Sequence, residues 1–167
     1  MRMLKKCNDF LYNMTTIRYV IFMACIGYAC SIILLNMVHL IVGINFSQVG
    51  GPDYYNIFDK ILFAIILSPV IETLVFQTFV FAVMKEIRWF KSKEFLMILF
   101  SAVCFSGMHM IYNVYYAMSA FIIGMILAYS FSIYSKKGKN ASVVVILIHS
   151  FINMISILIP IIWSGLK

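Results

Sequence analysis

The sequence has little charge, little proline and little glycine. Only 11% of its 167 residues are Asp, Glu, Lys or Arg, whereas 63% are hydrophobic, and the mean hydropathy is +0.99. A soluble domain carries about 25% charged residues, so the composition excludes an ordinary soluble fold. The sequence also shows no low-complexity segment and no clear internal repeat. Its length suits one compact membrane domain.

The four cysteines follow no pattern typical of a disulfide framework or a metal site. Cys7, Cys25, Cys30 and Cys104 include no CxxC spacing, and the last three lie within apolar stretches. We interpret these three as small buried apolar side chains. A cleavable signal peptide is not predicted either, because the first apolar run is too long and lacks a small-residue cleavage site in the expected place.

The sequence does contain long hydrophobic runs, and these predict the fold class. About 20 apolar residues are needed to cross the hydrocarbon core. We therefore predict an all-α fold, a polytopic transmembrane helical bundle of about five spans. The expected spans are Tyr19–Gly43, Ile61–Met84, Phe95–Tyr112, Ala117–Tyr134 and Ala141–Trp163. Residues 1–60 are expected to form a cytoplasmic lead-in, the first transmembrane helix and an external loop, and residues 61–163 a helical core.

The net charge of +7 is expected to report topology, not a nucleic-acid partner. With a cytoplasmic N-terminus, only Lys60 and Lys167 of the thirteen Lys and Arg fall outside. That asymmetry is what the positive-inside rule requires of a multi-pass protein in the cell membrane. We therefore predict the lipid bilayer as a partner. The eleven residues expected inside are Arg2, Lys5, Lys6, Arg18, Lys85, Arg88, Lys91, Lys93, Lys136, Lys137 and Lys139.

Three polar clusters interrupt the apolar runs. They contain Glu72, His109 and the pair His149 and Asn153. Ionisable residues at bilayer depth are costly, face the interior of a bundle and usually mark a functional site. Residues four apart share one face of a helix, so each cluster can present its polar atoms toward a shared interior. Pro69 is expected to free the carbonyl of Ile65 and to kink the helix just before Glu72.

These residue types suit hydrolysis of an amide bond. Glu72 can serve as a base that takes a proton from water, and His109 can orient that water or share its proton. His149 and Asn153, one turn apart, can donate to the oxyanion that forms when water attacks the carbonyl.

The polar clusters also resemble the three motifs of a known family. Glu72-Thr73-x-x-x-Gln77, Phe105-x-x-x-His109 and His149-x-x-x-Asn153 are similar, in order and context, to EExxxR, FxxxH and HxxxN or HxxxD. These are the motifs of the CPBP family of CAAX-protease and bacteriocin-processing membrane peptidases, also called Abi. The resemblance covers roughly residues 61–160, so the helical core is expected to be the catalytic part.

The chain departs from the family pattern at two positions in the first motif. Thr73 stands where a second glutamate is expected, and Gln77 stands where an arginine is expected. The two changes fit together, because replacing both partners of a buried ion pair leaves no lone charge, whereas removing one partner costs several kcal/mol. Thr73 and Gln77 are expected to hydrogen-bond to each other or to a neighbouring helix.

The resemblance implies a glutamate-type intramembrane endopeptidase without a cofactor, acting on a peptide or protein substrate in or at the membrane, with bacteriocin processing or immunity as its setting. A zinc site formed by Glu72, His109 and His149 is the less favoured version. Three alternatives remain open: a catalytically silent immunity or scaffold protein, a small solute-binding transporter subunit, and a haem bound between His109 and His149.

Overall fold

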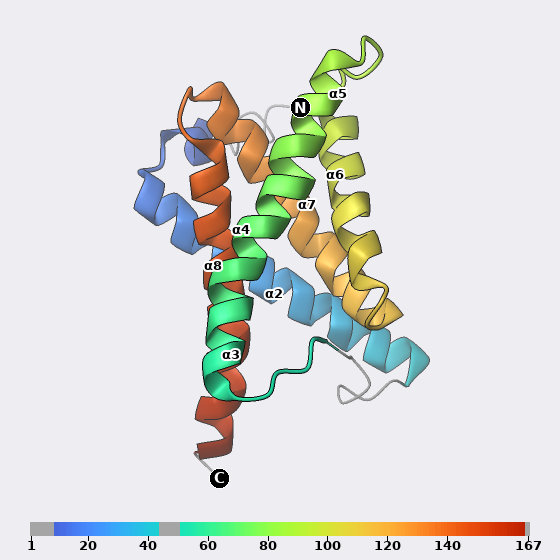
Figure 1. Ribbon diagram of the computed structural model, residues 1–167, viewed down its shortest axis with the longest axis vertical. Coiled ribbons are helices and arrows are strands. Elements are labelled where there is room, and N and C mark those ends of the chain that lie inside the picture. Colours follow the sequence, from blue (N-terminus) through green and yellow to red (C-terminus); the bar gives the residue numbers. More distant parts are fainter. Residues whose placement is uncertain (1–8, 44–50, 166–167) are drawn as a thin grey trace.

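The computed structural model of the protein describes residues 9–43 and 51–165 and shows a bundle of helices (Figure 1). No strand occurs among these residues, which confirms the all-α prediction. Four helices are long and apolar enough to cross a membrane, and a fifth apolar helix, α6, is shorter. The protein is therefore a polytopic membrane protein.

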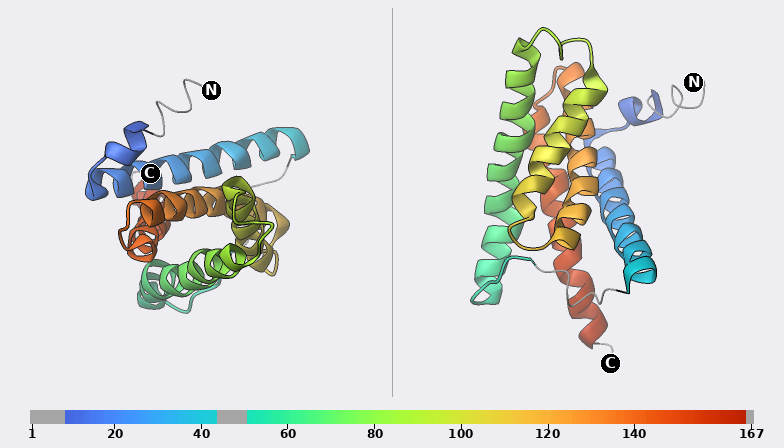
Figure 2. Two further views of the ribbon diagram at one scale, coloured as in Figure 1. Left: turned by 90° about the horizontal axis from the view of Figure 1, so that it is seen from above. Right: turned by 90° about the vertical axis from the view of Figure 1, so that its right-hand side faces the viewer.

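The first long helix, α2 (Thr16–Val42), crosses the bundle obliquely and packs against α7 and α8 (Figure 2). It ends at Gly43, whose φ of 73° is left-handed, and the Gly43 N–H donates to the His39 carbonyl. A left-handed glycine at this place is a common helix terminator. The predicted external loop lies partly outside the described residues, which resume at Gly51.

The second long helix runs without interruption from Ile57 to Glu86. It comprises α3 (Ile57–Ile61), a wider π-helical segment η2 (Leu62–Leu67), α4 (Ser68–Glu72), a second π-helical segment η3 (Thr73–Phe79), and α5 (Val80–Glu86). Asn56 caps its start, because the Asn56 side chain accepts from the Asp59 N–H. Glu72 therefore lies near the middle of the helix, with a π-helical segment on either side.

The remaining helices form an antiparallel set (Figure 1). Helix α6 (Glu94–His109) is followed by a tight turn at 110–113, then by α7 (Val114–Lys136) and α8 (Ala141–Gly165). Helices α6 and α7 pack against each other as an antiparallel pair. Helix α6 ends at His109, three residues before the end of the predicted span, and its 16 residues make it about 24 Å long.

Helix α7 is the central element. In its apolar stretch 56% of the residues are buried inside the protein, against 17% to 33% in the other three long helices. Gly124 allows α6 to approach closely, because a Cβ at this position would lie 3.1 Å from the Phe105 ring and 3.2 Å from Ala102 Cα. Small residues at such crossings are typical of membrane bundles.

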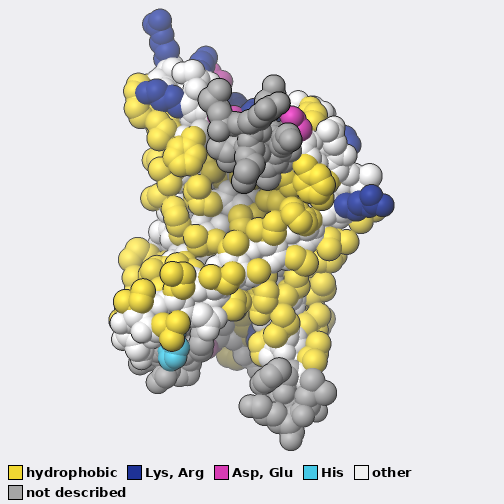
Figure 3. Space-filling view, turned by 180° about the vertical axis from the view of Figure 1, so that it is seen from behind, with side chains coloured by type: hydrophobic (Ala, Val, Ile, Leu, Met, Phe, Trp, Pro, Cys, Tyr) yellow, Lys and Arg dark blue, Asp and Glu magenta, His cyan; other side chains and the backbone are white. Residues whose placement is uncertain are grey.

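The surface has an apolar middle, and lysines and arginines gather toward one end (Figure 3). That end contains the α5–α6 turn, the α7–α8 turn and the start of α2. The other end contains the α6–α7 turn and the start of α3 (Figure 1). We call these the basic end and the opposite end. Large exposed hydrophobic side chains, such as Phe79 and Ile71, face outward where lipid would surround the protein.

Candidate active site

The three predicted clusters meet inside the bundle, at the middle of the Ile57–Glu86 helix. Glu72 Oε2 lies 3.8 Å from His109 Nε2 and 3.8 Å from His149 Nε2. His149 is buried and His109 nearly so, whereas Glu72 is about one quarter exposed. The structure thus brings together a carboxylate and two imidazoles from three separate helices.

The orientation of His109 is defined by its own helix. His109 Nδ1 lies 2.7 Å from the Phe105 carbonyl, one turn earlier in α6. A carbonyl can only accept, so Nδ1 carries the hydrogen of the neutral ring, and the lone pair is on Nε2. That lone pair faces Glu72, which is an acceptor when ionised. The distance of 3.8 Å is too long for a direct hydrogen bond and suits a bridging donor.

Phe105 supports both histidines. Its side chain is 1% exposed, and its ring centroid lies 4.6 Å from that of His109 and 5.6 Å from that of His149. A third aromatic contact, to Phe76, is edge-on at 5.7 Å. The phenylalanine of the second motif therefore packs between the site and Gly124 of α7, and fixes where the imidazoles lie.

Asn153 lines the cavity and also binds the backbone of another helix. Its Nδ2 donates to the Ala64 carbonyl at 2.7 Å. The Ser68 N–H bonds to the Phe63 carbonyl five residues earlier. The same five-residue separation would pair the Ala64 carbonyl with the N–H of residue 69, but residue 69 is a proline and has no N–H. Asn153 thus provides a donor to a carbonyl that the proline leaves without one, and it joins α8 to η2.

The prediction for Pro69 needs correction on this point. We expected the free carbonyl at Ile65, but a π-helical segment precedes Pro69, so the carbonyl five residues before the proline is that of Ala64. The expected kink stays a prediction. The wider turns change the hydrogen-bonding register, so the interhelical bond falls on Ala64. A similar bond occurs in η3, where Ser101 Oγ donates to the Phe76 carbonyl at 2.7 Å. Such π-helical segments are frequent at functional sites.

Thr73 and Gln77 lie beside the site but make no hydrogen bond through their side chains. Both are 0% exposed, and Thr73 Oγ1, Gln77 Oε1 and Gln77 Nε2 have no partner. The prediction that they bond to each other or to a neighbouring helix is therefore wrong. Their Cα positions are one α-helical turn apart in sequence, but the π-helical register of η3 alters the angle between them.

A cavity of about 250 Å³ adjoins the three residues. It is far larger than the volume of about 30 Å³ that one water occupies in the liquid. Its lining includes Tyr54, Tyr112 and Tyr116, as well as Lys60 and Ser68. Burial raises the pKa of the Tyr54 phenol above its ordinary value, and the nearby Tyr112 and Glu72 raise it further. Tyr54 therefore remains a hydrogen-bond donor at the mouth.

Sequence reasoning missed Tyr116, whose ring centroid lies 5.4 Å from that of His109. The predicted spans leave residues 113–116 as a turn, but α7 already begins at Val114. Asn113 caps α7 by accepting from the Tyr115 N–H at 2.8 Å. A hairpin centred near residue 112 puts residue 116 opposite residue 109. The cap at Asn113 is the signal that could have revealed this neighbour.

A zinc site formed by Glu72, His109 and His149 is the less favoured version that the resemblance allows. Within residues 9–43 and 51–165, no group of three or more His, Cys, Asp or Glu is arranged so that it could hold a metal ion.

The fold and the site together define a helical membrane protein with a Glu–His–His cluster at the end of an intramembrane cavity. The model of the type II CAAX prenyl endopeptidase Rce1-like family matches residues 56–155. The chain belongs to this Rce1-like family, which confirms the resemblance to CAAX-type CPBP proteases, and membership implies a peptidase. No curated protein and no solved structure matches the chain.

Proposed function

We propose that the protein is an intramembrane endopeptidase of the glutamate type. In this proposal Glu72 and His109 activate a water that attacks a peptide bond of a membrane-associated or exported peptide. The observation that carries it is the equal distance of 3.8 Å from Glu72 Oε2 to the Nε2 atoms of His109 and His149. A water between Glu72 and His109 can donate to both acceptors and turn a lone pair toward the cavity.

The proposed reaction is a hydrolysis in two steps. The water oxygen forms a bond to the scissile carbonyl carbon while its proton passes to Glu72, and the carbonyl oxygen becomes an oxyanion. His149 donates from Nε2 to that oxyanion. Glu72 then returns the proton to the amide nitrogen, the C–N bond breaks, and a new carboxyl and a new amine leave.

Asn153 has a supporting part in this scheme. Its amide donates to the Ala64 carbonyl, which holds α8 against η2 and places His149, one turn earlier, beside Glu72. The second N–H of the same amide remains available for the oxyanion. We therefore assign Asn153 chiefly to positioning and His149 to oxyanion stabilisation.

The proposed setting is the cell membrane, with a bacteriocin-like or other exported peptide as substrate and no cofactor. The experiment that tests the function compares protein termini in cells that express the wild type, Glu72→Gln or Glu86→Gln at equal levels. Glu86 is exposed and ends the same helix, so Glu86→Gln is a matched control. New N- and C-termini should occur with the wild type and Glu86→Gln, and not with Glu72→Gln.

One observation favours a second candidate, a catalytically silent immunity or scaffold protein. The charged half of the first motif is replaced by Thr73 and Gln77, whose polar atoms have no partner. In that case the termini would be identical in all three strains, and a protective phenotype would survive in Glu72→Gln. If Glu72→Gln lost both the protective phenotype and the new termini, this candidate would be rejected.

A further inference from the structure

The cavity at the site extends toward one end of the bundle. From Glu72 it reaches back along the helix to Lys60, a distance of about 18 Å at 1.5 Å per residue. On α8 it extends from His149 to Ile157, away from the α7–α8 turn. Pro52 and Tyr54 lie at its mouth, before the start of α3. The mouth is therefore at the opposite end, not at the basic end.

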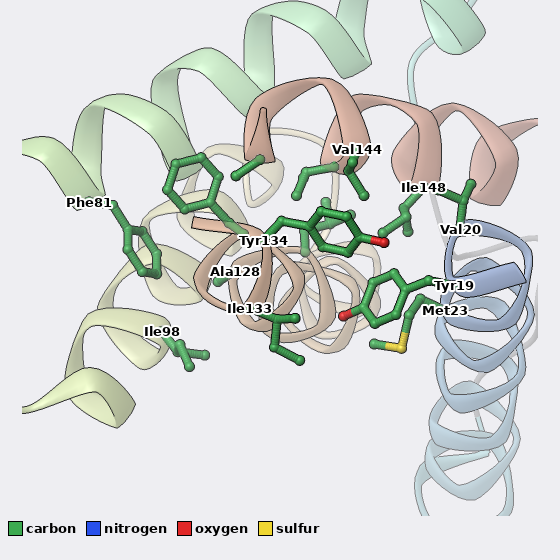
Figure 4. Close-up of a cluster of buried hydrophobic side chains, with 14 of the residues drawn as sticks. Tyr19, Val20, Met23, Phe81, Ile98, Ala128, Ile133, Tyr134, Val144 and Ile148 are labelled. Atoms are coloured by element: carbon green, nitrogen blue, oxygen red, sulfur yellow. The ribbon is translucent and has the colours of Figure 1, made fainter. Parts of the chain in front are cut away.

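The hydrophobic core lies between the site and the basic end. Figure 4 shows part of this core. Between the site and the basic end lie Phe81 and Met84 of α5, Tyr134 of α7, and Val145 and Ile148 of α8, each no more than 2% exposed. These side chains belong to one continuous cluster that also includes the start of α2. A packed apolar core of this kind leaves no route for a peptide.

Among the described residues, every Lys and Arg except Lys60 lies at or near the basic end. Arg18 lies at the start of α2, Lys85 near the end of α5, Lys93 directly before α6, and Lys136 and Lys139 around the α7–α8 turn. Lys60 is the cation that lines the cavity among the described residues. By the positive-inside rule, the basic end faces the cytoplasm.

The interfacial aromatics agree with a mouth at membrane-surface depth. Tyr54, Tyr112 and Tyr116 line the cavity near its opening, and Tyr112 and Tyr116 stack edge-on at 5.8 Å. Tyrosine is enriched where hydrocarbon meets water, because its ring is apolar and its hydroxyl needs a polar partner. The opening thus lies where a peptide at the membrane surface could enter.

We propose that the cavity opens to the non-cytoplasmic side of the membrane, so that the substrate is a peptide segment presented from that side after export. That the cavity receives a substrate peptide rests on the proposed function, whereas the direction in which the cavity opens does not. The substrate class that follows is a translocated peptide or an external segment of a membrane protein, in contact with the outer surface of the bilayer.

The test is labelling of single cysteines with a charged, membrane-impermeant thiol reagent. Three substitutions are introduced separately into a variant without the four native cysteines. Ser68→Cys lies within the cavity, Tyr55→Cys is fully exposed beside its mouth, and Lys139→Cys is exposed at the basic end. Each is labelled in intact cells and in inside-out vesicles. Labelling of every variant in detergent shows that the thiol is present.

The proposal predicts that Ser68→Cys and Tyr55→Cys are labelled in intact cells, at least tenfold more than in sealed inside-out vesicles, and that Lys139→Cys shows the reverse. Labelling of Ser68→Cys from the same side as Lys139→Cys would overturn it. Failure of Ser68→Cys to react from either side would also overturn the proposal, because the cavity would then be closed. If cells with Glu72→Gln had the same protein termini as cells with the wild type, the proposed peptidase would be rejected. The labelling pattern would still be expected, because it depends only on where the cavity opens.

Discussion

At the scale of single residues, the site depends on side chains that hold other side chains. Phe105 contacts both imidazoles, and its own carbonyl orients His109. Asn153 donates to the Ala64 carbonyl, a bond that the sequence did not predict. The histidines therefore approach Glu72 because of contacts made one helical turn away from each of them.

Asn153→Ala should lower stability, because the Ala64 carbonyl would lose the donor that Asn153 supplies inside the bundle. The expected cost is about 1–3 kcal/mol, measured as a shift in the thermal unfolding midpoint in detergent. Asn36→Ala is the matched control, since Asn36 also donates to a helix carbonyl, that of Ile32, but at an exposed position within its own helix. Equal effects of the two substitutions would contradict the role given to the Asn153 bond.

The Thr73 and Gln77 pair makes a second prediction at this scale. Both side chains are fully buried, so Thr73→Glu or Gln77→Arg alone would bury a lone charge at a cost of several kcal/mol. The double substitution restores a charge pair and should be more stable than either single variant. The measurement is the folded yield and thermal midpoint of all four proteins. A double variant no better than the worse single one would show that the two positions are not coupled.

The proposed mechanism also predicts independence from metal. Cleavage by the purified protein should change less than twofold when a strong zinc chelator is added, because Glu72, His109 and His149 act through water and hydrogen bonds in the proposed scheme. Loss of activity with a chelator, and its recovery with zinc, would require a ligand arrangement that the described residues do not show.

At the scale of elements, hydropathy predicted the helices well and their internal register poorly. The long apolar runs gave α2, α7 and α8 to within a few residues, because crossing a bilayer demands length and apolarity that any window detects. The π-helical segments on either side of Glu72 were not predicted. Each segment has a carbonyl that accepts from another helix, Ala64 from Asn153 and Phe76 from Ser101, and no local pattern reveals such donors.

The end of α6 shows a second limit of local patterns. The apolar run continues to Tyr112, but the helix stops at His109 and turns over 110–113 into α7. Hydropathy does not distinguish the last helical residue from an apolar turn. The convergence of the three motifs was predicted from spacing and depth, whereas the proximity of Tyr116 to His109 depends on where that turn lies.

The α6–α7 contact gives a prediction for glycine. Gly124→Ala would place a methyl group 3.1 Å from Phe105 and 3.2 Å from the Ala102 backbone, so α6 or α7 must shift. We expect a loss of about 1–3 kcal/mol in stability and a lower cleavage rate through Phe105. Gly107→Ala is the control, because nothing lies within 4 Å of its added methyl group. It should be neutral or stabilising, and similar losses for both variants would contradict the close-approach argument.

At the scale of the whole molecule, the two ends of the bundle differ in chemistry. The basic end is closed by a packed core and tied together by Lys136 and Ser132, which both donate to Glu94. The opposite end has tyrosines, Lys60 and the mouth of the cavity. One half of the protein thus stabilises the bundle, and the other half admits water and, in our proposal, a peptide.

The most direct test of the central claim is the single-turnover rate of peptide cleavage by the purified protein in lipid vesicles. It should be measured for the wild type, Glu72→Gln and Glu86→Gln on a substrate identified from the new termini. We expect Glu72→Gln to be slower by a factor of about 10² to 10⁴, the usual contribution of a general base, and Glu86→Gln to match the wild type. Cleavage by Glu72→Gln at the wild-type rate would contradict the account.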